Sequence, residues 1–406
     1  MSKQSDRVVI TGIGIVNPAG IGKDAFWSNV TEGKSAIRNI SRFDATGYPT
    51  QVAGEISEFD PADFIPRRFI VKTDRFTHYA LAATDLALKD ADLDLEKEDS
   101  YRVGVWFGNN AGGWDIAERG FYELYQDGPT MVNPWQATAW FPTAAQGFVT
   151  IRFGIRGYSK SFVCDRASGA SGLYFGIKSI QQGHNDIVIA GGSEAPITKF
   201  GMNCYYETGE VTAATDPETA YQPFDRNRSG LVLGEGSSVL VLESFEHATN
   251  RGAKIYGEVV SGSMTTDHDT TKGTQFERCM RKAIKDAGIT PGDIDVVFAE
   301  GCGTQNSDRV EAQALQAVFG EEAPNVPITT PKSLYGHLYG ASCVTEVACS
   351  LLSMETGKLP TQKITAPDPG CQLNFVTQPQ SIPVSRTLVN SRAREGVNAA
   401  FVISKV

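Results

Sequence analysis

The chain has 406 residues, of which 41% are hydrophobic and 21% charged, as is typical of a globular protein with one large domain or two ordinary ones. A net charge of -10 argues against a nucleic-acid partner, because binding phosphates requires clustered Lys and Arg. The longest apolar stretches are far shorter than the roughly 18 residues of a membrane span. Since Met1 to Asp6 also has no signal-peptide pattern, we expect a cytoplasmic protein that contacts no membrane.

Seven cysteines are present, an odd number, and no pair has CxxC spacing. This pattern predicts reduced thiols rather than a disulfide framework or a zinc site. The sequence indicates no metal ion and no cofactor.

Strand and helix signals alternate along the chain, which is the order expected of an α/β protein. Residues 212–236 are rich in loop signals and could separate two halves. Strands are predicted within "RVVITGIGIV", "YRVGVWFGNN", "YSKSFVCD", "NDIVIAGGSE" and "GEGSSVLVLES", and helices near residues 23–33, 78–93 and 168–182.

Two short internal echoes indicate a duplicated α/β unit. "ALKDADL" precedes the strand "VGVWFGNN" in the first half, and "AIKDAGI" precedes "IDVVFAEGCG" in the second. "GAS" at Gly169 opens a predicted helix, and "GAS" at Gly340 opens another. Two such halves, residues 1–250 and residues 251–406, would stack with helices between their sheets.

Several longer motifs carry a specific resemblance over nearly the whole chain. They are "VVITGIGIVNPAG", "GGSEAPIT", "PFDRNRSGLVLGEG", "KSLYGHLYGAS" and "APDPGCQLNFV". Through them the chain resembles the β-ketoacyl synthase family of the thiolase superfamily. The resemblance implies a five-layered αβαβα fold of two similar halves, a dimer, and acyl transfer from a carrier-protein thioester to a cysteine, followed by decarboxylative condensation.

The residues that family members use for this chemistry are largely replaced here. By the resemblance, the nucleophilic cysteine falls on Arg166 in "VCDRASGASG", and the first histidine, of an "HGTGT"-like loop, falls on Glu300. Lys332, His337 and Glu311 match family positions, and we expect Lys332 to pair with Glu311. His337 could polarise a thioester carbonyl or serve as a buried hydrogen-bonding residue.

The glycine-rich turn that supplies oxyanion donors in active members is also altered. In "NSRAREGVNAA" this turn holds Arg394 and Glu395. Preorganised donors often give the largest single contribution to acyl transfer. A guanidinium has no lone pair available at neutral pH, so Arg166 cannot be a nucleophile. We therefore expect Arg166 and Glu300 to face each other as a bidentate ion pair that fills the pocket.

A ketosynthase-like chain without its nucleophile resembles the chain length factor, or β subunit, of type II polyketide and polyene synthases. These subunits usually carry glutamine at the elbow, so arginine is a departure and the product class stays open. The resemblance implies a noncatalytic subunit that forms a heterodimer with a catalytic ketosynthase, works with acyl carrier protein, and shapes the tunnel for the growing acyl chain.

Aromatic residues between Trp106 and Phe148 are the candidates for this tunnel. Spacing of i, i+3 and i+7 places three of the side chains on one helical face. Aromatic residues serve equally well in an ordinary dimer core. The candidates are Trp114, Ala117 and Phe121 on that face, with Trp135 and Phe141 after it.

Two other functions fit the sequence. In the first, the chain is an acyltransferase in which Cys302, Cys164 or Ser168 is an unorthodox nucleophile, or a malonyl decarboxylase supported by His337 and Lys332. In the second, the chain is a homodimeric protein that binds acyl carrier protein or a small acyl ligand.

Overall fold

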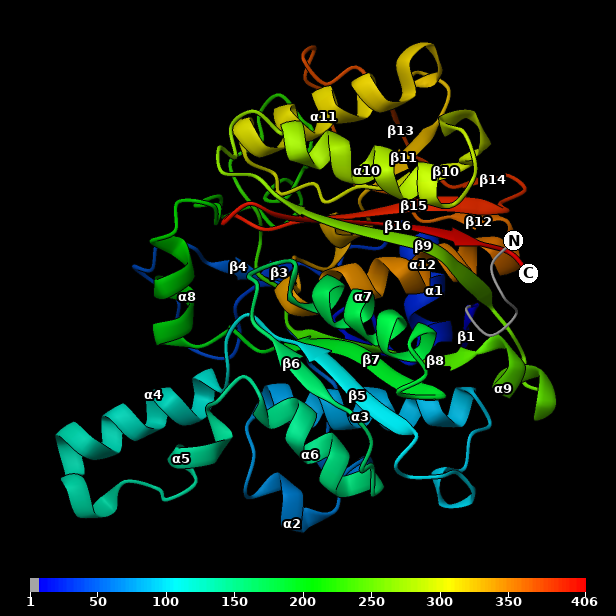
Figure 1. The fold of residues 1–406 in the computed structure, drawn as a ribbon. Helices are drawn as coiled ribbons and strands as arrows, with labels where there is room; N and C mark the ends of the chain where they lie inside the picture. Colours follow the sequence, from blue (N-terminus) through cyan, green and yellow to red (C-terminus); the bar gives the residue numbers. More distant parts are fainter. Residues whose placement is uncertain (1–6) are drawn as a thin grey trace.

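Helices and sheets are stacked in five alternating layers in the computed structural model, which describes residues 7–406 (Figure 1). Residues 1–6, where no signal peptide is expected, lie outside the described residues. The first outer layer holds α3 (Arg75–Asp90) and α6 (Ala144–Phe153), and the first sheet layer holds β1 (Val8–Asn17), β5 (Val103–Gly108), β6 (Lys160–Phe162), β7 (Ile187–Glu194) and β8 (Gly236–Ser244). The middle layer holds α7 (Ser168–Gln181) and α12 (Ser342–Thr356). The second sheet layer holds β9 (Gly257–Thr266), β10 (Val296–Phe298), β11 (Pro327–Thr329), β13 (Asn374–Phe375), β15 (Arg386–Arg392) and β16 (Val397–Ser404), and α10 (Thr274–Asp286) and α11 (Gln305–Phe319) cover it.

The two sheet layers repeat one pairing pattern. In the first, β6, β5 and β7 are mutually parallel neighbours, and β7, β8 and β1 are antiparallel. In the second, β11, β10 and β15 are parallel, and β15, β16 and β9 are antiparallel. β1 joins the layers by pairing with β9 at Val9 and Ile10. This repetition confirms the duplicated unit predicted from the echoes; the boundary at residue 250 stays a prediction.

The two "GAS" segments meet at the centre of the molecule. A Cβ atom on Gly169 would lie only 2.0 Å from the carbonyl oxygen of Gly340, so these backbones approach more closely than any side chain allows. The first turn of α7 is therefore held beside the loop that precedes α12. This contact brings residue 166, just before α7, close to the loop around residue 337.

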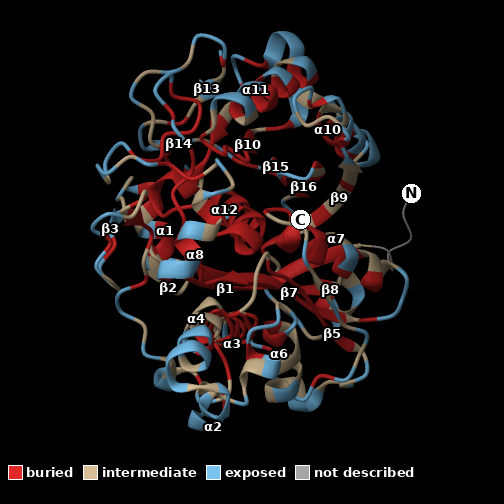
Figure 2. Ribbon diagram, turned by 90° about the vertical axis from the view of Figure 1, so that its left-hand side faces the viewer, coloured by how far each residue is buried: buried red, intermediate tan, exposed pale blue. Residues whose placement is uncertain are grey.

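Packing of α3 on β1 follows from small residues on both elements. Cβ atoms on Gly12 and Gly14 would lie 2.3 and 1.9 Å from the carbonyl oxygens of Ala87 and Ala83. Both alanines are fully buried. The buried residues concentrate in the two sheets and in the helices between them, as Figure 2 shows.

Shorter elements complete the chain, and the loop-rich residues 212–236 run from α8 to β8 as predicted. Among the described residues, none of the helices combines the length and the apolar character that a membrane crossing requires. All seven cysteines are free thiols. The remaining helices are α1 (Lys23–Thr31), α2 (Arg67–Ile70), α4 (Trp114–Tyr122), α5 (Gln136–Ala139), α8 (Lys199–Tyr206) and α9 (Phe245–Asn250), and the remaining strands are β2 (Gly20–Ile21), β3 (Arg38–Asn39), β4 (Val52–Ala53), β12 (Lys358–Leu359) and β14 (Gln380–Ser381).

Candidate functional site

A tight turn between β6 and α7 carries Arg166, the residue that the resemblance aligns with the family's nucleophile. Asp165 has a φ of 49°, which is unusual for a residue other than glycine. The Ser168 hydroxyl holds the turn by accepting a hydrogen bond from Cys164 N (2.8 Å) and donating one to Asp165 O (2.6 Å). The turn directs Arg166 into the interior, where only 1% of its surface is exposed.

Arg166 is enclosed by acceptors on several segments of the chain. Its Nη1 atom donates to Glu210 Oε2 at 2.5 Å, and its Nε atom donates to the Arg392 carbonyl oxygen at 3.1 Å. The same Nη1 lies 3.3 Å from Cys302 Sγ. A buried guanidinium needs such partners because an unpaired charge is costly to remove from water.

Glu300 does lie beside Arg166, but not in the geometry predicted from the sequence. Arg166 Nε is 3.5 Å from Glu300 Oε1, and the Arg166 hydrogen bonds go to Glu210, the Arg392 carbonyl oxygen and Cys302 instead, so the prediction of a bidentate pair is wrong. The shortest ion pair of Arg166 is with Glu210. Glu210 lies 44 positions away in a segment without a motif, so the sequence alone did not predict it.

Glu300 instead makes its closest side-chain contact with His337, at 2.8 Å between Oε1 and Nε2. His337 Nδ1 accepts a hydrogen bond from Tyr339 N (3.0 Å), so the neutral ring carries its proton on Nε2 and donates it to Glu300. Burial lowers the pKa of His337 to about 4, despite the neighbouring carboxylate. The N–H that could polarise a thioester carbonyl is therefore already bound to an anion.

The carboxylate of Glu300 stays ionised in this buried position. Burial opposes ionisation, but the positive charge of Lys332, together with His337 and Arg166, lowers the pKa of Glu300 to about 2. A negative charge here would repel the oxyanion of an acyl-transfer intermediate, which active sites stabilise with donors.

Lys332 does not pair with Glu311, so that prediction is wrong. Its Nζ atom lies 2.7 Å from Glu346 Oε1 and 3.7 Å from Glu300 Oε2, and it donates to the Glu300 carbonyl oxygen at 2.6 Å. Glu311 accepts hydrogen bonds from the backbone N–H groups of Glu300 and Gly301, both at 2.9 Å. Glu311 therefore supports the loop that carries Glu300, and Glu346 is a further site residue that the sequence analysis missed.

The three alternative nucleophiles are poorly placed. Cys302 is 1% exposed, and burial raises the pKa of its thiol well above the ordinary value, despite the opposing effect of Arg166. A thiol in this state has little thiolate, which is the reactive form. Ser168 is fully buried and its hydroxyl holds the elbow turn, while Cys164 is half-buried at the base of that turn.

The turn between β15 and β16 faces the elbow through its backbone. Arg394 N donates to Asp165 Oδ2 at 2.8 Å, so this amide is occupied by a carboxylate. The Arg394 and Glu395 side chains are exposed and pair with each other at 3.0 Å. The altered turn thus closes the site with protein contacts.

The candidate tunnel residues lie in the segment of residues 111–143, which we call the arm; it projects from the first half (Figure 1). The helical face predicted for Trp114, Ala117 and Phe121 lies on α4. Trp114 and Phe121 share a face, because both rings contact Phe200, with centroids 5.7 and 5.5 Å away. Ala117 is half-buried on α4. The Nζ atom of Lys72 lies over Trp135, 4.9 Å from the centroid of the Trp135 ring. Phe141 is 45% exposed and stacks on Trp140. Their contact with an acyl chain stays a prediction.

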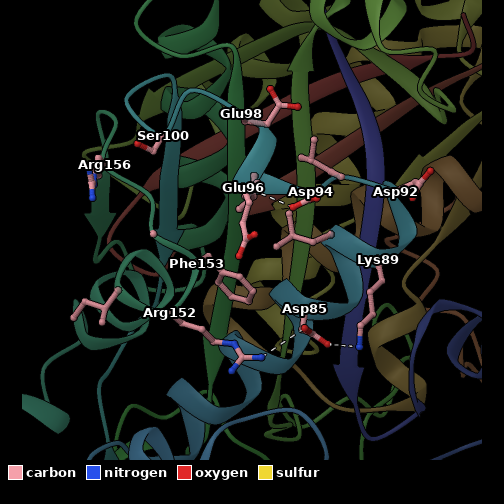
Figure 3. A pocket seen from close by; sticks show the side chains of 15 residues that line it. Asp85, Lys89, Asp92, Asp94, Glu96, Glu98, Ser100, Arg152, Phe153 and Arg156 are labelled. Atoms are coloured by element: carbon pink, nitrogen blue, oxygen red, sulfur yellow. Dashed lines mark hydrogen bonds and ion pairs between the residues drawn. The ribbon is translucent and has the colours of Figure 1, made fainter.

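A groove of about 960 Å³ lies away from these residues, between the end of α3, the following loop and the end of α6 (Figure 3). Within it, Asp85 pairs with Lys89 at 2.7 Å and lies 3.6 Å from Arg152. Because no residue of the elbow network lines it, we assign the groove no role in acyl chemistry.

Removing Arg166 should destabilise the fold strongly. Arg166→Met leaves Glu210 and Glu300 without their shared cation, and we expect a loss of about 3–5 kcal/mol in unfolding free energy. Combining it with Glu210→Gln should cost less than the sum of the two single changes, by about 1 kcal/mol or more. Urea unfolding measures both; strict additivity would contradict the coupling. Arg394→Met, which breaks an exposed pair, is the control and should cost at most about 1 kcal/mol.

Acid should destabilise the protein through His337. Its pKa is about 4 in the folded chain and 6.5 unperturbed. Between these values the unfolded chain binds a proton that the folded chain does not, so stability falls as pH falls. From pH 7 to pH 5 this contributes a loss of about 2 kcal/mol. In urea unfolding, the unfolding free energy of His337→Asn should fall less between pH 7 and pH 5 than that of the unmodified protein, by this amount. Equal losses in the two proteins would contradict the low pKa of His337.

Two family models match most of the chain. The model of the beta-ketoacyl synthase N-terminal domain matches residues 5–248, and that of the C-terminal domain matches residues 253–364. The tetracenomycin polyketide synthase ketoacyl synthase beta subunit of Streptomyces glaucescens is 38% identical over 403 residues, which are 98% of each chain. The 3-oxoacyl-acyl-carrier-protein synthase 2 of Staphylococcus aureus (strain COL) is 36% identical over 409 residues, 99% of each chain.

A solved structure, the ishigamide ketosynthase/chain length factor, is similar with a TM-score of 0.87 and 27% identity, covering 98% of this chain and 99% of that chain. The matched domains, the repeated strand pattern and the elbow before α7 lead to one conclusion: the chain belongs to the beta-ketoacyl synthase family and has its thiolase-like fold.

Proposed function

We propose that this chain is a noncatalytic chain length factor, the ketosynthase β subunit, which pairs with an active ketosynthase and shapes the tunnel for a polyketide or polyene chain. The observation that carries the proposal is Arg166 at the tip of the elbow, buried and bound to Glu210 and the Arg392 carbonyl oxygen. A side chain in this state can neither attack a thioester nor leave room for one. The 38% identical beta subunit from Streptomyces glaucescens supports the same assignment.

The pairing of His337 with Glu300 weighs against a self-sufficient enzyme. Decarboxylation of a malonyl thioester builds negative charge on the thioester oxygen, and a histidine N–H would have to stabilise it. Here that N–H is bound to an ionised carboxylate. Similarity to the Staphylococcus aureus synthase places the chain in a family of acyl-condensing enzymes and agrees with acyl carrier protein as a partner of the complex.

An unpaired sheet edge supports a dimeric assembly. β6 ends the sheet and, in the part of the chain that the structure describes, pairs on one side only, with β5. Next to it are the side chains of Tyr158, Val163 and Phe175, which are 48%, 56% and 42% exposed. An exposed edge with apolar neighbours favours pairing with another strand. We propose that the ketosynthase partner covers this edge, which would place the partner's site near the arm.

Intact mass spectrometry tests whether the chain is catalytic. The protein is incubated with acyl and malonyl carrier-protein thioesters, alone and with an intact ketosynthase. We expect acyl mass on the ketosynthase only, and condensation only when both chains are present. Cys302→Ser should change neither result. Acyl mass on this chain that disappears in Cys302→Ser would overturn the proposal and identify an unorthodox enzyme; thioester binding by a homodimer without condensation would identify a binding protein.

Smaller side chains on α4 should lengthen the product. Phe121→Ala or Trp114→Ala removes a ring from the face that we propose as the tunnel floor, so the acyl product can grow by at least one more extender unit. Chromatography with mass detection of products from the reconstituted pair measures this. Tyr101→Ala, an exposed ring before β5, at the opposite end of that strand from the arm, is the control. Unchanged product length in both α4 variants, with the pair still active, would remove these residues from the tunnel.

A further inference from the structure

The arm leaves the body between β5 and α6 and carries many exposed large apolar side chains. Several of the contacts that hold it to the body lie near its base, where α4 begins. On one side, Trp114 packs against Phe200 and Tyr205 of α8, and Glu118 accepts a hydrogen bond from Phe200 N at 2.8 Å. The other side of the base faces the first residues of α3. The exposed apolar residues of the arm are Phe121, Tyr122, Leu124, Tyr125, Met131, Trp140 and Phe141.

One carboxylate binds the N-termini of two helices at this point. Asp74 is the N-cap of α3, where its Oδ1 accepts a hydrogen bond from Phe76 N at 3.3 Å. Its Oδ2 accepts a second one, at 2.8 Å, from Ile116 N in the first turn of α4. A Cβ atom on Gly113 would lie 2.7 Å from Asp74 Cβ, so the arm backbone passes directly against this side chain. Asp74 is 3% exposed.

The next residue of α3 makes a second contact with the same turn of α4. Arg75 Nε lies 2.9 Å from Asp115 Oδ2, and Arg75 Nη1 is 3.9 Å from Glu235 Oε2. Glu235 is fully buried and also binds Arg42. The base of the arm is thus tied through charges to α3 and to the start of β8.

Apolar packing does not fill the space beside these contacts. A cavity of about 600 Å³ lies there, and charged groups from both the body and the arm line it. On the side that faces this cavity, directional polar contacts hold the first turn of α4, and on the opposite side Trp114 packs against α8. The charged residues lining the cavity are Arg42, Asp74, Arg75, Asp115 and Arg119.

We infer that Asp74, Arg75 and Asp115 form a clamp that fixes the angle of the arm, and that the clamp thereby determines product length from outside the tunnel. The length effect rests on the proposed function. The clamp residues act as positioning residues: Asp74 binds the backbone of α4, and Arg75 of α3 binds Asp115 of α4. The aromatic face of α4 is what the acyl chain would meet.

Asp74→Ser separates the two bonds of Asp74. Serine is a good N-cap and can still bind the start of α3, but its side chain is too short to reach Ile116 N. Hydrogen exchange of the isolated chain should become at least tenfold faster at the α4 amides, while the α3 amides keep the exchange rates of the unmodified protein. Asp115→Asn, which weakens the second contact, should accelerate α4 exchange to a smaller degree. Asp85→Asn, which breaks a pair elsewhere on α3, should leave α4 exchange unchanged.

The reconstituted pair then tests the length effect. Asp74→Ser and Asp115→Asn should broaden the distribution of product lengths while the total rate of condensation stays within about twofold, and Asp85→Asn should leave the distribution unchanged. Unaltered α4 exchange in Asp74→Ser would overturn the clamp, and faster exchange with an unchanged distribution would overturn its role in length. Absence of any condensation with the unmodified chain would instead contradict the proposed function, and hydrogen exchange would still decide the clamp.

Discussion

The burial of one guanidinium constrains the rest of the site. Arg166 is carried into the interior by the elbow turn, and an isolated charge there would cost several kcal/mol. The chain meets this cost with acceptors from three distant segments, namely Glu210, Glu300 and the Arg392 carbonyl oxygen. Because each acceptor lies on a different segment, the charge ties the start of α7 to the loop after α8, the loop after β10 and the end of β15.

Glu300 shows how the replacements depend on each other. Its carboxylate neutralises the charges of Arg166 and Lys332 and also accepts a hydrogen bond from Nε2–H of His337. A carboxylate in this position without these cations would be protonated or would disrupt the fold. The same negative charge is unsuitable for an oxyanion. The network is therefore consistent as a structural core, and its negative charge supports the proposal that this chain does not catalyse acyl transfer.

The sequence was sufficient to predict the layers, the duplicated unit, the helix at α4 and the opposition of Arg166 and Glu300, because each left a periodic pattern or a motif. It failed where partners were decided by the direction of a side chain. Glu311 accepts hydrogen bonds from the backbone of residues 300–301 instead of pairing with Lys332, and Lys332 pairs with Glu346. Glu210 was missed because no local pattern marks a carboxylate in a loop that tertiary packing brings to Arg166.

Ring contacts connect the filled site with the arm. Trp114 packs on Tyr205, whose ring centroid lies 4.6 Å from that of Tyr339, and Tyr339 N binds His337. A rigid charge network behind Tyr339 thus gives the inner face of α4 a fixed support, while the clamp holds its first turn from the other side. If the chain is noncatalytic, as proposed, these side chains need not move for a reaction and can be tightly bound. Tight binding would then let the arm present a surface of constant shape to a partner.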